Sequence, residues 1–253
     1  MQPTFLLTHR FYPTIGKAFF IALQLVAFNA FADGSDEASD IQYKLTVSQY
    51  SAKQLSATDI NLRAKFDQQS AWLAYYSETP ADFKQARAGY ERVDKWDLLK
   101  ADSTIQVADY GFIGGSLTLE LGGALHAIVG YGRTNLKPYD NINFDPNDSI
   151  TYGAGFEFEE GKDIALYRVK DDRVMPGQQI DHLLLHYSVA DKNKLTLDIF
   201  NKSGPADADG KSIAGTGAAI SDEWAKYFIR LAYDPKVNFT QKNMSRISLG
   251  FYF

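Results

Sequence analysis

Apolar side chains recur at every second position from residue 41 to the C-terminus. The segment "IQYKLTVSQY" (41–50) shows the pattern, with the alternate residues Ile41, Tyr43, Leu45 and Val47 on one face of an extended chain. The same alternation runs through 58–66, 85–91, 125–133, 150–158, 164–170, 195–200, 227–233 and 246–253. It is weaker in 70–77, 103–110, 115–121, 180–188 and 211–220. A period of two is that of a β-strand with one apolar face, so the sequence predicts an all-β chain of 14 strands. If 103–121 is a single bent element, the number is 12.

The connections between these segments fall into two classes. The short class has turn-forming compositions and comprises 67–70, 121–124, 159–162, 190–193 and 221–224. The longer class comprises 134–148, 171–179, 203–210 and 234–243. With a periplasmic N-terminus the two classes alternate along the chain, and a last strand that returns to the periplasm requires an even number of strands. The segment 93–102 is too long for a short turn, and the pattern does not assign it.

The apolar faces need an apolar neighbour, which is either a second sheet or lipid. The polar faces carry many full charges, whereas the apolar faces carry Tyr, Phe and Leu in nearly every segment, and 14% of all residues are aromatic. Strands of about ten alternating residues with short turns on one side and longer loops on the other are typical of a transmembrane barrel. Within hydrocarbon every backbone N–H and C=O must pair, which a closed sheet achieves. The sequence therefore predicts an antiparallel up-and-down transmembrane β-barrel over 41–253, with a soluble β-sandwich as the alternative.

The first 32 residues have the pattern of a secretory signal peptide. Arg10 and Lys17 precede the apolar segment "AFFIALQLVAF" (18–28), and the small-x-small sequence Ala30-Phe31-Ala32 offers a cleavage site. A buried N-terminal helix is the alternative. The sequence thus predicts a cleaved signal peptide at 1–32, a flexible periplasmic N-terminus at 33–40, and export through the periplasm. No stretch of 18 or more apolar residues follows, so a membrane-spanning helix is not expected. The chain has no cysteine, which excludes disulfides, thiolate metal sites, a catalytic Cys and a lipidated Cys.

The chain ends in "ISLGFYF" (247–253), an apolar row with nothing after it to cover it. If this row faces lipid and its strand pairs with the first strand, no sheet edge remains. The segment resembles the C-terminal signal that Gram-negative outer-membrane β-barrel proteins present to their assembly machinery, through Ile247, Leu249, Gly250, Phe251 and Phe253. The segments "GRTN" (132–135), "NFDPND" (143–148) and "DPKVNF" (234–239) resemble an uncharacterised porin-like family. The resemblance implies location in the outer membrane, outer-membrane lipid and the barrel-assembly machinery as partners, and a monomer. It implies no particular activity.

Alternation also predicts which side chains line the lumen. The predicted set is Arg63, Lys65, Arg87, Glu91, Arg133, Glu157, Arg168, Lys170, His182, His186, Asp198, Arg230 and Arg246. With Asp59 added, these positions hold eight Lys or Arg and four carboxylates, an excess of four positive charges. Arg and Lys rings in a pore favour anions, so the sequence predicts a small diffusion channel with a mild preference for small anionic solutes. The alternative is that the charges pair with one another and fill a small barrel.

Glycines on two adjacent predicted strands face the same side. Gly130 and Gly132 precede the loop 134–148, and Gly153 and Gly155 follow it; symmetric pairing about the loop sets Gly130 opposite Gly153. Glycines inside strands often mark the close approach of another group. We expect either that the loop folds inward onto this wall as a constriction or that the glycines serve sheet curvature.

The histidines suggest a second class of function. The same pairing sets His126 opposite Glu157, and places His182 and His186 near Asp198. A lipid hydrolase of the outer membrane would need a Ser beside such a His, and Ser188 lies near a turn, so a polar network is favoured. No catalytic residue, cofactor or metal ligand is assigned. Basic residues are dispersed over the strands, so nucleic-acid binding is not expected. The alternatives to a channel are a lipid-modifying hydrolase and a non-conducting structural or adhesive barrel.

Overall fold

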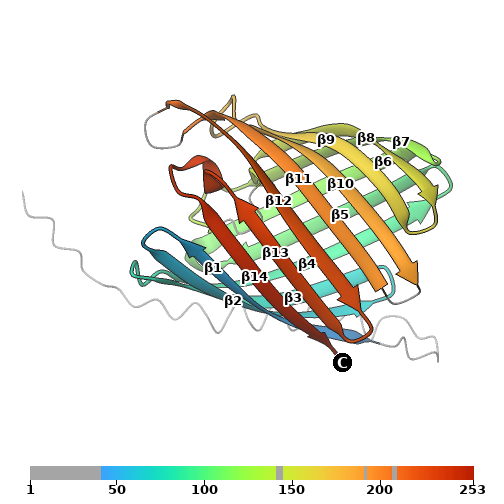
Figure 1. The fold of residues 1–253 in the computed structure, drawn as a ribbon, viewed down its shortest axis with the longest axis horizontal. Coiled ribbons are helices and arrows are strands. Elements are labelled where there is room, and N and C mark those ends of the chain that lie inside the picture. Colours follow the sequence, from blue (N-terminus) through green and yellow to red (C-terminus); the bar gives the residue numbers. More distant parts are fainter. Residues whose placement is uncertain (1–40, 141–144, 191–192, 207–209) are drawn as a thin grey trace, which may run out of the picture. The chain divides into compact units, whose positions relative to one another are not determined.

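The computed structural model describes residues 41–140, 145–190, 193–206 and 210–253. The predicted signal peptide and N-terminal segment, 1–32 and 33–40, lie outside the described residues. Fourteen antiparallel strands in the described part close into a barrel in which each strand pairs with its neighbours in sequence and β1 pairs with β14 (Figure 1). The strands are β1 (Gln42–Ala52), β2 (Leu55–Phe66), β3 (Gln69–Thr79), β4 (Lys84–Trp96), β5 (Leu99–Ala108), β6 (Phe112–Gly122), β7 (Leu125–Thr134), β8 (Ser149–Glu159), β9 (Lys162–Asp171), β10 (Gln179–Ala190), β11 (Asn193–Pro205), β12 (Ser212–Trp224), β13 (Tyr227–Asp234) and β14 (Met244–Tyr252).

The prediction of a 14-stranded up-and-down barrel is confirmed, and the 12-stranded alternative is wrong. Residues 103–121 do not form one bent element, because the 3-10 turn η1 (Asp109–Gly111) reverses the chain between β5 and β6. The unassigned segment 93–102 belongs to β4 and β5, whose pairing continues through Val93 and Asp102 to a two-residue turn. Alternation is weak there because the polar residues of both strands extend close to the turn.

The last strand closes the barrel against the first. Leu45 pairs with Phe251, and beyond the strand end the Tyr43 and Phe253 backbones exchange hydrogen bonds of 2.9 and 3.0 Å. The rings of Tyr43 and Phe253 stack with their centroids 5.7 Å apart. The apolar row of the C-terminus is therefore part of the outer surface of a closed sheet, and its strand has no free edge.

The outer surface of the barrel is apolar. Large exposed apolar side chains occur on nearly every strand, among them Leu62, Tyr75, Ile105, Leu117, Val129, Phe156, Leu166, Leu183, Ile199, Ile220, Leu231 and Leu249. An apolar surface of this extent marks contact with lipid or with another protein, and its closure around the barrel is that of a transmembrane barrel. None of the helices in the described ranges is long and apolar enough to cross a membrane.

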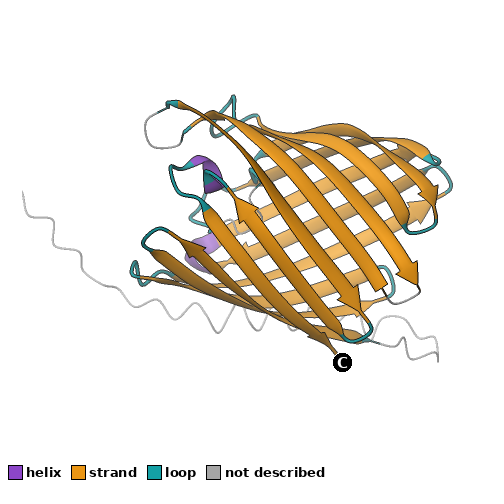
Figure 2. Ribbon diagram, in the orientation of Figure 1, coloured by secondary structure: helices purple, strands orange, loops and turns teal. Residues whose placement is uncertain are grey.

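Connections of different length lie at the two ends of the strands (Figure 2). At one end, two residues separate the strands of the pairs β2–β3, β4–β5, β6–β7, β8–β9 and β12–β13; at the other end only β1–β2, among the described connections, is this short. The predicted turn at 221–224 is wrong in position, since these residues complete β12 and the turn is at 225–226. At the other end the longest connections are 135–148 and 235–243.

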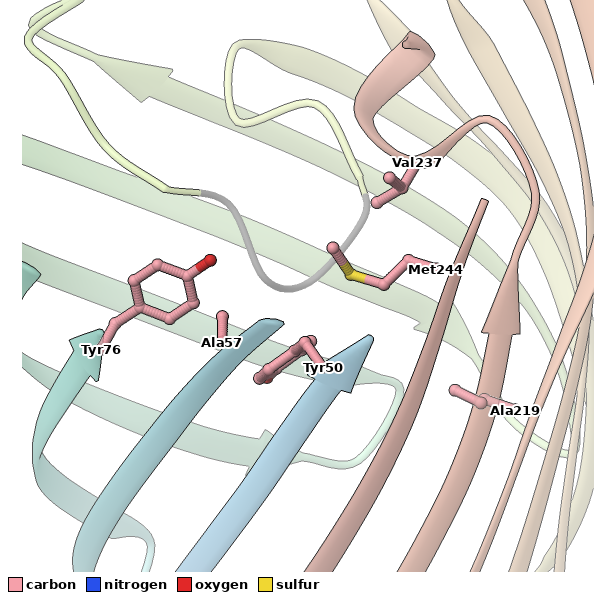
Figure 3. Close-up of a cluster of buried hydrophobic side chains, with 7 residues drawn as sticks. Tyr50, Ala57, Tyr76, Ala219, Val237 and Met244 are labelled. Carbon is pink, nitrogen blue, oxygen red and sulfur yellow. The ribbon is translucent and has the colours of Figure 1, made fainter. Parts of the chain in front are cut away.

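Apolar side chains also fill part of the barrel interior at the long-loop end. One cluster consists of Tyr50, Ala57, Tyr76, Ala219, Ala232, Val237 and Met244, and Figure 3 shows its side chains converging inside the barrel. A second cluster consists of Ile180, Phe200, Ala206, Ile213 and Phe239. Both clusters take a residue from the 3-10 turn η2 (Val237–Phe239), so the 235–243 connection packs into this end of the barrel. Periodicity alone did not indicate these contacts.

The middle of the inner face of β12 is made of the small residues Gly215, Gly217, Ala219 and Ser221. A Cβ on Gly217 would lie 2.4 Å from the Phe200 ring, and a Cβ on Gly215 would lie 2.9 Å from Pro235. Side chains from β11 can therefore lie across β12. Lys202 does so and reaches Asp234 on β13, with Nζ 2.6 Å from Oδ1 and both side chains fully buried.

Candidate functional site: the barrel lumen and its inner loop

Strand alternation places most of the predicted lumen-lining residues on inner faces. Each shares its face with buried neighbours, such as Ala57, Gln85, Ile180 and Ser248. The inward residues of the predicted set are Arg63, Lys65, Arg87, Glu91, Glu157, His182, His186, Asp198, Arg230 and Arg246. Glu157 lies at the short-turn end of β8, where its side chain is exposed.

Arg133, Arg168 and Lys170 lie instead on outer faces, which corrects their predicted position. Arg133 shares its face with Tyr131, which is exposed, and Arg168 and Lys170 share theirs with Leu166, which is 63% exposed. All three lie near the long-loop ends of β7 and β9. Near the strand ends the outer face lies beyond the hydrocarbon core and carries polar residues. A charged residue at such a position therefore does not indicate that its side chain faces the lumen.

Two of these outward cations make paired contacts with carboxylates of neighbouring segments. Arg168 donates to Asp181 at 2.5 and 2.8 Å, and Arg133 donates to Asp172 at 2.9 and 2.6 Å. Arg133 also lies over the Tyr131 ring, 3.8 Å from its centroid. These contacts tie adjacent strands and loops together, and each of the two cations is matched by a carboxylate.

Several cations in the lumen are matched by carboxylates. Arg87 and Asp59 form a buried ion pair, and Arg63 lies 3.0 Å from Glu91. Two further pairs, Lys44–Glu223 at 3.2 Å and Lys100–Glu120 at 2.6 Å, involve residues outside the predicted set. Alternation could have indicated Lys44, which follows an apolar residue in the first predicted strand. Lys100 lies in the unassigned segment.

The loop 135–148 is anchored on two parts of the inner wall by its described flanks. On one flank, Gln85 Nε2 donates to Pro138 O and Gln85 Oε1 accepts from Asp140 N, both at 3.1 Å. Tyr139 stacks on Phe112 with centroids 4.1 Å apart and donates its hydroxyl hydrogen bond to Gln106 at 3.1 Å.

On the other flank, Asp145 lies 3.1 Å from Nε2 of His182, on β10. The two flanks thus contact β4–β6 and β10, which are separated around the barrel. These contacts place the described flanks inside the lumen, as the inward-folding alternative expected. We call residues 135–140 and 145–148 the inner loop; 141–144 lie outside the described residues.

The glycines serve both expected purposes at different positions. A Cβ on Gly132 would lie 2.6 Å from the carbonyl oxygen of Asn147, so the absence of a side chain at 132 allows the inner loop to approach the wall. A Cβ on Gly153 would lie 2.3 Å from the carbonyl oxygen of Leu166. The absence of a side chain at 153 therefore allows the backbone of the next strand to approach, which permits the sheet to curve. The predicted pairing of Gly130 with Gly153 is wrong by two residues, because Gly130 pairs with Thr151.

Burial of the inner loop affects one of its carboxyl groups. Burial raises the pKa of Asp140 above its ordinary range, against the lowering effects of the Tyr76 hydroxyl and the Arg87 guanidinium. Docking therefore favours the protonated carboxyl. Its contribution to loop docking is fully present below the ordinary carboxyl pKa and is lost as the pH rises through the raised pKa.

We expect acidification through this range to hold the inner loop more tightly and to reduce its fluctuations. Open-channel current noise recorded as a function of pH measures this effect. The substitution Asp140→Asn should remove the dependence, because the amide does not titrate. The same pH profile in Asp140→Asn would contradict the assignment.

Two cavities lie beside the inner loop. One has a volume of about 370 Å³ and is bounded by the walls of β2–β9 and the loop residues Tyr139 and Asn147. The other has a volume of about 340 Å³ and includes His182, Asp198 and Arg230 in its lining. Asp145 borders both cavities. The described part of the loop narrows the lumen and leaves these two cavities beside it.

The three histidines in the described ranges lie beside carboxylates. His182 lies between Asp198, 3.0 Å from Nδ1, and Asp145, and its ring stacks on Tyr167. His186 lies 3.0 Å from Asp163 rather than near Asp198.

His126 faces Gly155 and not the predicted Glu157, and lies 3.9 Å from Glu120. In the part of the chain that the structure describes, no Ser hydroxyl bonds a histidine, and no group of three His, Cys, Asp or Glu side chains forms a metal site. Around the described histidines the geometry gives polar networks with carboxylates.

The structure is that of a porin-like outer-membrane β-barrel. The sheet is closed and antiparallel with an even number of strands, its exterior is apolar, and its lumen is charged and holds an inward loop. Among solved structures, the chain is similar to the outer-membrane protein Omp33 of Acinetobacter baumannii, with 10% identity over 86% of this chain and 100% of that one and a TM-score of 0.52. It is also similar to the KdgM porin (7% identity, 83% and 99% covered, TM-score 0.45) and the NanC porin (11%, 83% and 98%, 0.46). At these identities the likeness concerns the fold. No protein-family model matches the chain, and no curated protein matches it significantly.

Proposed function

We propose that the protein is a narrow diffusion channel of the outer membrane for small polar solutes. The observation that supports this is the inner loop, which is anchored to the wall on both flanks and leaves a cavity on either side of Asp145. In a barrel plugged for a purely structural role, we would expect the loop to fill the space along the wall rather than leave cavities there. The porin-like fold agrees with this function.

We propose that its selectivity by charge is weak. Of the eight cations that the sequence placed inside, Arg133, Arg168 and Lys170 face outward, and Arg63 and Arg87 are paired with carboxylates. The preference for anions then depends on fewer cations than the eight that the sequence placed inside. Within the described residues, Nε of Arg230 is buried and makes no hydrogen bond, and Arg230 lines the 340 Å³ cavity. Arg246 also faces inward, on the neighbouring strand.

Planar-bilayer recordings of the purified chain test both parts of the proposal. We expect discrete conductance steps and a small reversal potential in a salt gradient, with the sign of anion preference. Arg230→Ala should shift the reversal potential toward cations, because it removes a charge from the lumen.

Arg168→Ala is the matched control and should leave the reversal potential unchanged, since its charge is outside. Absence of any conductance would favour the non-conducting barrel and refute the channel. Equal shifts in both variants would contradict the assignment of the two faces.

We further propose that the closing strand carries the assembly signal. Its outward row of Ile247, Leu249, Phe251 and Phe253 is exposed on a strand that closes the barrel only when folding is complete, and Gly250 packs inside against Phe228 and Thr46. Before closure this row is available to the barrel-assembly machinery. The monomeric state is proposed from the closed sheet, which needs no second copy to cover an edge.

A further inference from the structure

A tryptophan lies against the inner wall of the 370 Å³ cavity. Trp72 is on the inner face of β3, opposite Gly89 of β4. A Cβ on Gly89 would lie 2.4 Å from both Cε2 and Cζ2 of the indole, so the ring occupies the space that any other residue at 89 would fill. One side of the indole is thus against the backbone, and the ring lines the cavity. Trp96 and Trp224, the two other tryptophans of the chain, are exposed.

The groups around this indole offer hydrogen bonds without net charge. The cavity is lined by the hydroxyls of Thr104, Ser116, Thr118 and Thr151 and by the amides of Asn61 and Gln106. The three cations that line it are already matched, since Arg63 bonds Glu91 and Ser70, Arg87 bonds Asp59, and Arg133 bonds Asp172. An anion would have to compete with these carboxylates, whereas a neutral solute would not.

We propose that this cavity, which we call the Trp72 site, binds a neutral polyhydroxylated solute, such as a sugar of one or two rings. The C–H face of a sugar ring packs on an aromatic face, and its hydroxyls both donate to and accept from Thr, Ser, Asn and Gln. The volume of about 370 Å³ is at the small end of the range for sites of small molecules. This inference rests on the proposed channel and names the class of solute that dwells in it.

Fluorescence tests binding without the need for conductance. In the full chain with Trp96→Phe and Trp224→Phe, Trp72 is the sole tryptophan. Titration with maltose in detergent should change its emission saturably, and the midpoint should not depend on salt. Thr118→Val should weaken binding about 5-fold, the equivalent of one neutral hydrogen bond. Thr58→Val, at a position on the outer face of β2, is the matched control and should not change the midpoint.

Current recordings test the same site in the channel. Maltose should interrupt the current of the unmodified chain with a saturating concentration dependence, and Trp72→Ala should abolish the interruptions while the channel still conducts. If Trp72→Ala does not fold, Thr118→Val provides the test and should shift the saturation of the interruptions by the same 5-fold factor. Trp224→Ala, on the outer face, should leave the interruptions unchanged.

The outcomes separate the site from the channel. Conductance without a saturable change in Trp72 emission would overturn the proposed Trp72 site but would still support the proposed channel. Saturable emission without conductance supports the site and refutes the channel. Binding of galacturonate more than 10-fold tighter than maltose, weakening with salt, overturns the neutral class of solute, because charge would then dominate recognition.

Discussion

Replacing Lys202 by methionine is expected to lower the free energy of unfolding by about 3–5 kcal/mol, the range for removal of one partner of a buried ion pair. Lys202 and Asp234 are both fully buried, with Nζ 2.6 Å from Oδ1. Lys202→Met keeps the aliphatic stem beside Phe200 and Phe239 but leaves the Asp234 carboxylate without its cation. Urea unfolding of the barrel in detergent micelles, followed by the shift in gel mobility on heating, measures the change.

Two further variants separate the ion pair from side-chain volume. The double variant Lys202→Met/Asp234→Leu should recover most of the loss, because no charge is then left buried. Lys162→Met is the matched control. Lys162 lies 2.6 Å from Glu159 beside an exposed two-residue turn, and such a surface pair contributes less than about 1 kcal/mol. Equal losses for Lys202→Met and Lys162→Met would contradict the buried pair.

Replacing Gln85 by leucine is expected to release one flank of the inner loop and to raise both the mean conductance and the current noise. Gln85 is fully buried and holds Pro138 O and Asp140 N with two hydrogen bonds. At about 1 kcal/mol for each bond, the docking equilibrium should shift by a factor of about 30 toward the undocked loop. Single-channel recording measures both quantities.

Gln178→Leu is the control for this change. Gln178 is also buried, and its side-chain amide donates to Pro205 O at 2.9 Å, in a different connection. It should leave the conductance unchanged if the inner loop is what narrows the lumen. Identical currents for Gln85→Leu and the unmodified chain would show that this flank does not determine the pore.

The strand number and the closure of the sheet could be predicted from the sequence because both depend on a local period. Apolar residues at alternate positions identify most of the strands, and the exposed row of Ile247, Leu249 and Phe251 fits lipid around a closed sheet. Tight turns fix register, but composition located them only approximately: the turn after β12 is at 225–226 rather than 221–224, and the turn between β4 and β5 was not assigned.

The errors arise where a local period does not determine the geometry. The β7–β8 connection is too long to fix register, so Gly130 pairs with Thr151 rather than Gly153. Alternation assigned Arg168 and Lys170 to the lumen, yet they share the face of Leu166, which is the outer face and has turned polar near its end. The ion pair of Lys202 and Asp234 joins strands that are not adjacent, and no sequence period reports such a contact.

That last contact bears on the order in which the sheet would separate. Lys202 crosses the small residues Gly215 and Gly217, so β11, β12 and β13 are held together by side chains as well as by their backbones. At the seam of β1 and β14, the Ser48 and Ser248 hydroxyls, 2.8 Å apart, accompany the backbone ladder, and the ion pair of Lys44 with Glu223 on β12 also crosses the seam. The seam's ion pair is partly exposed, whereas that of Lys202 and Asp234 is fully buried. We therefore expect the seam to part first under denaturant and the three bridged strands to come apart last, as one cooperative block.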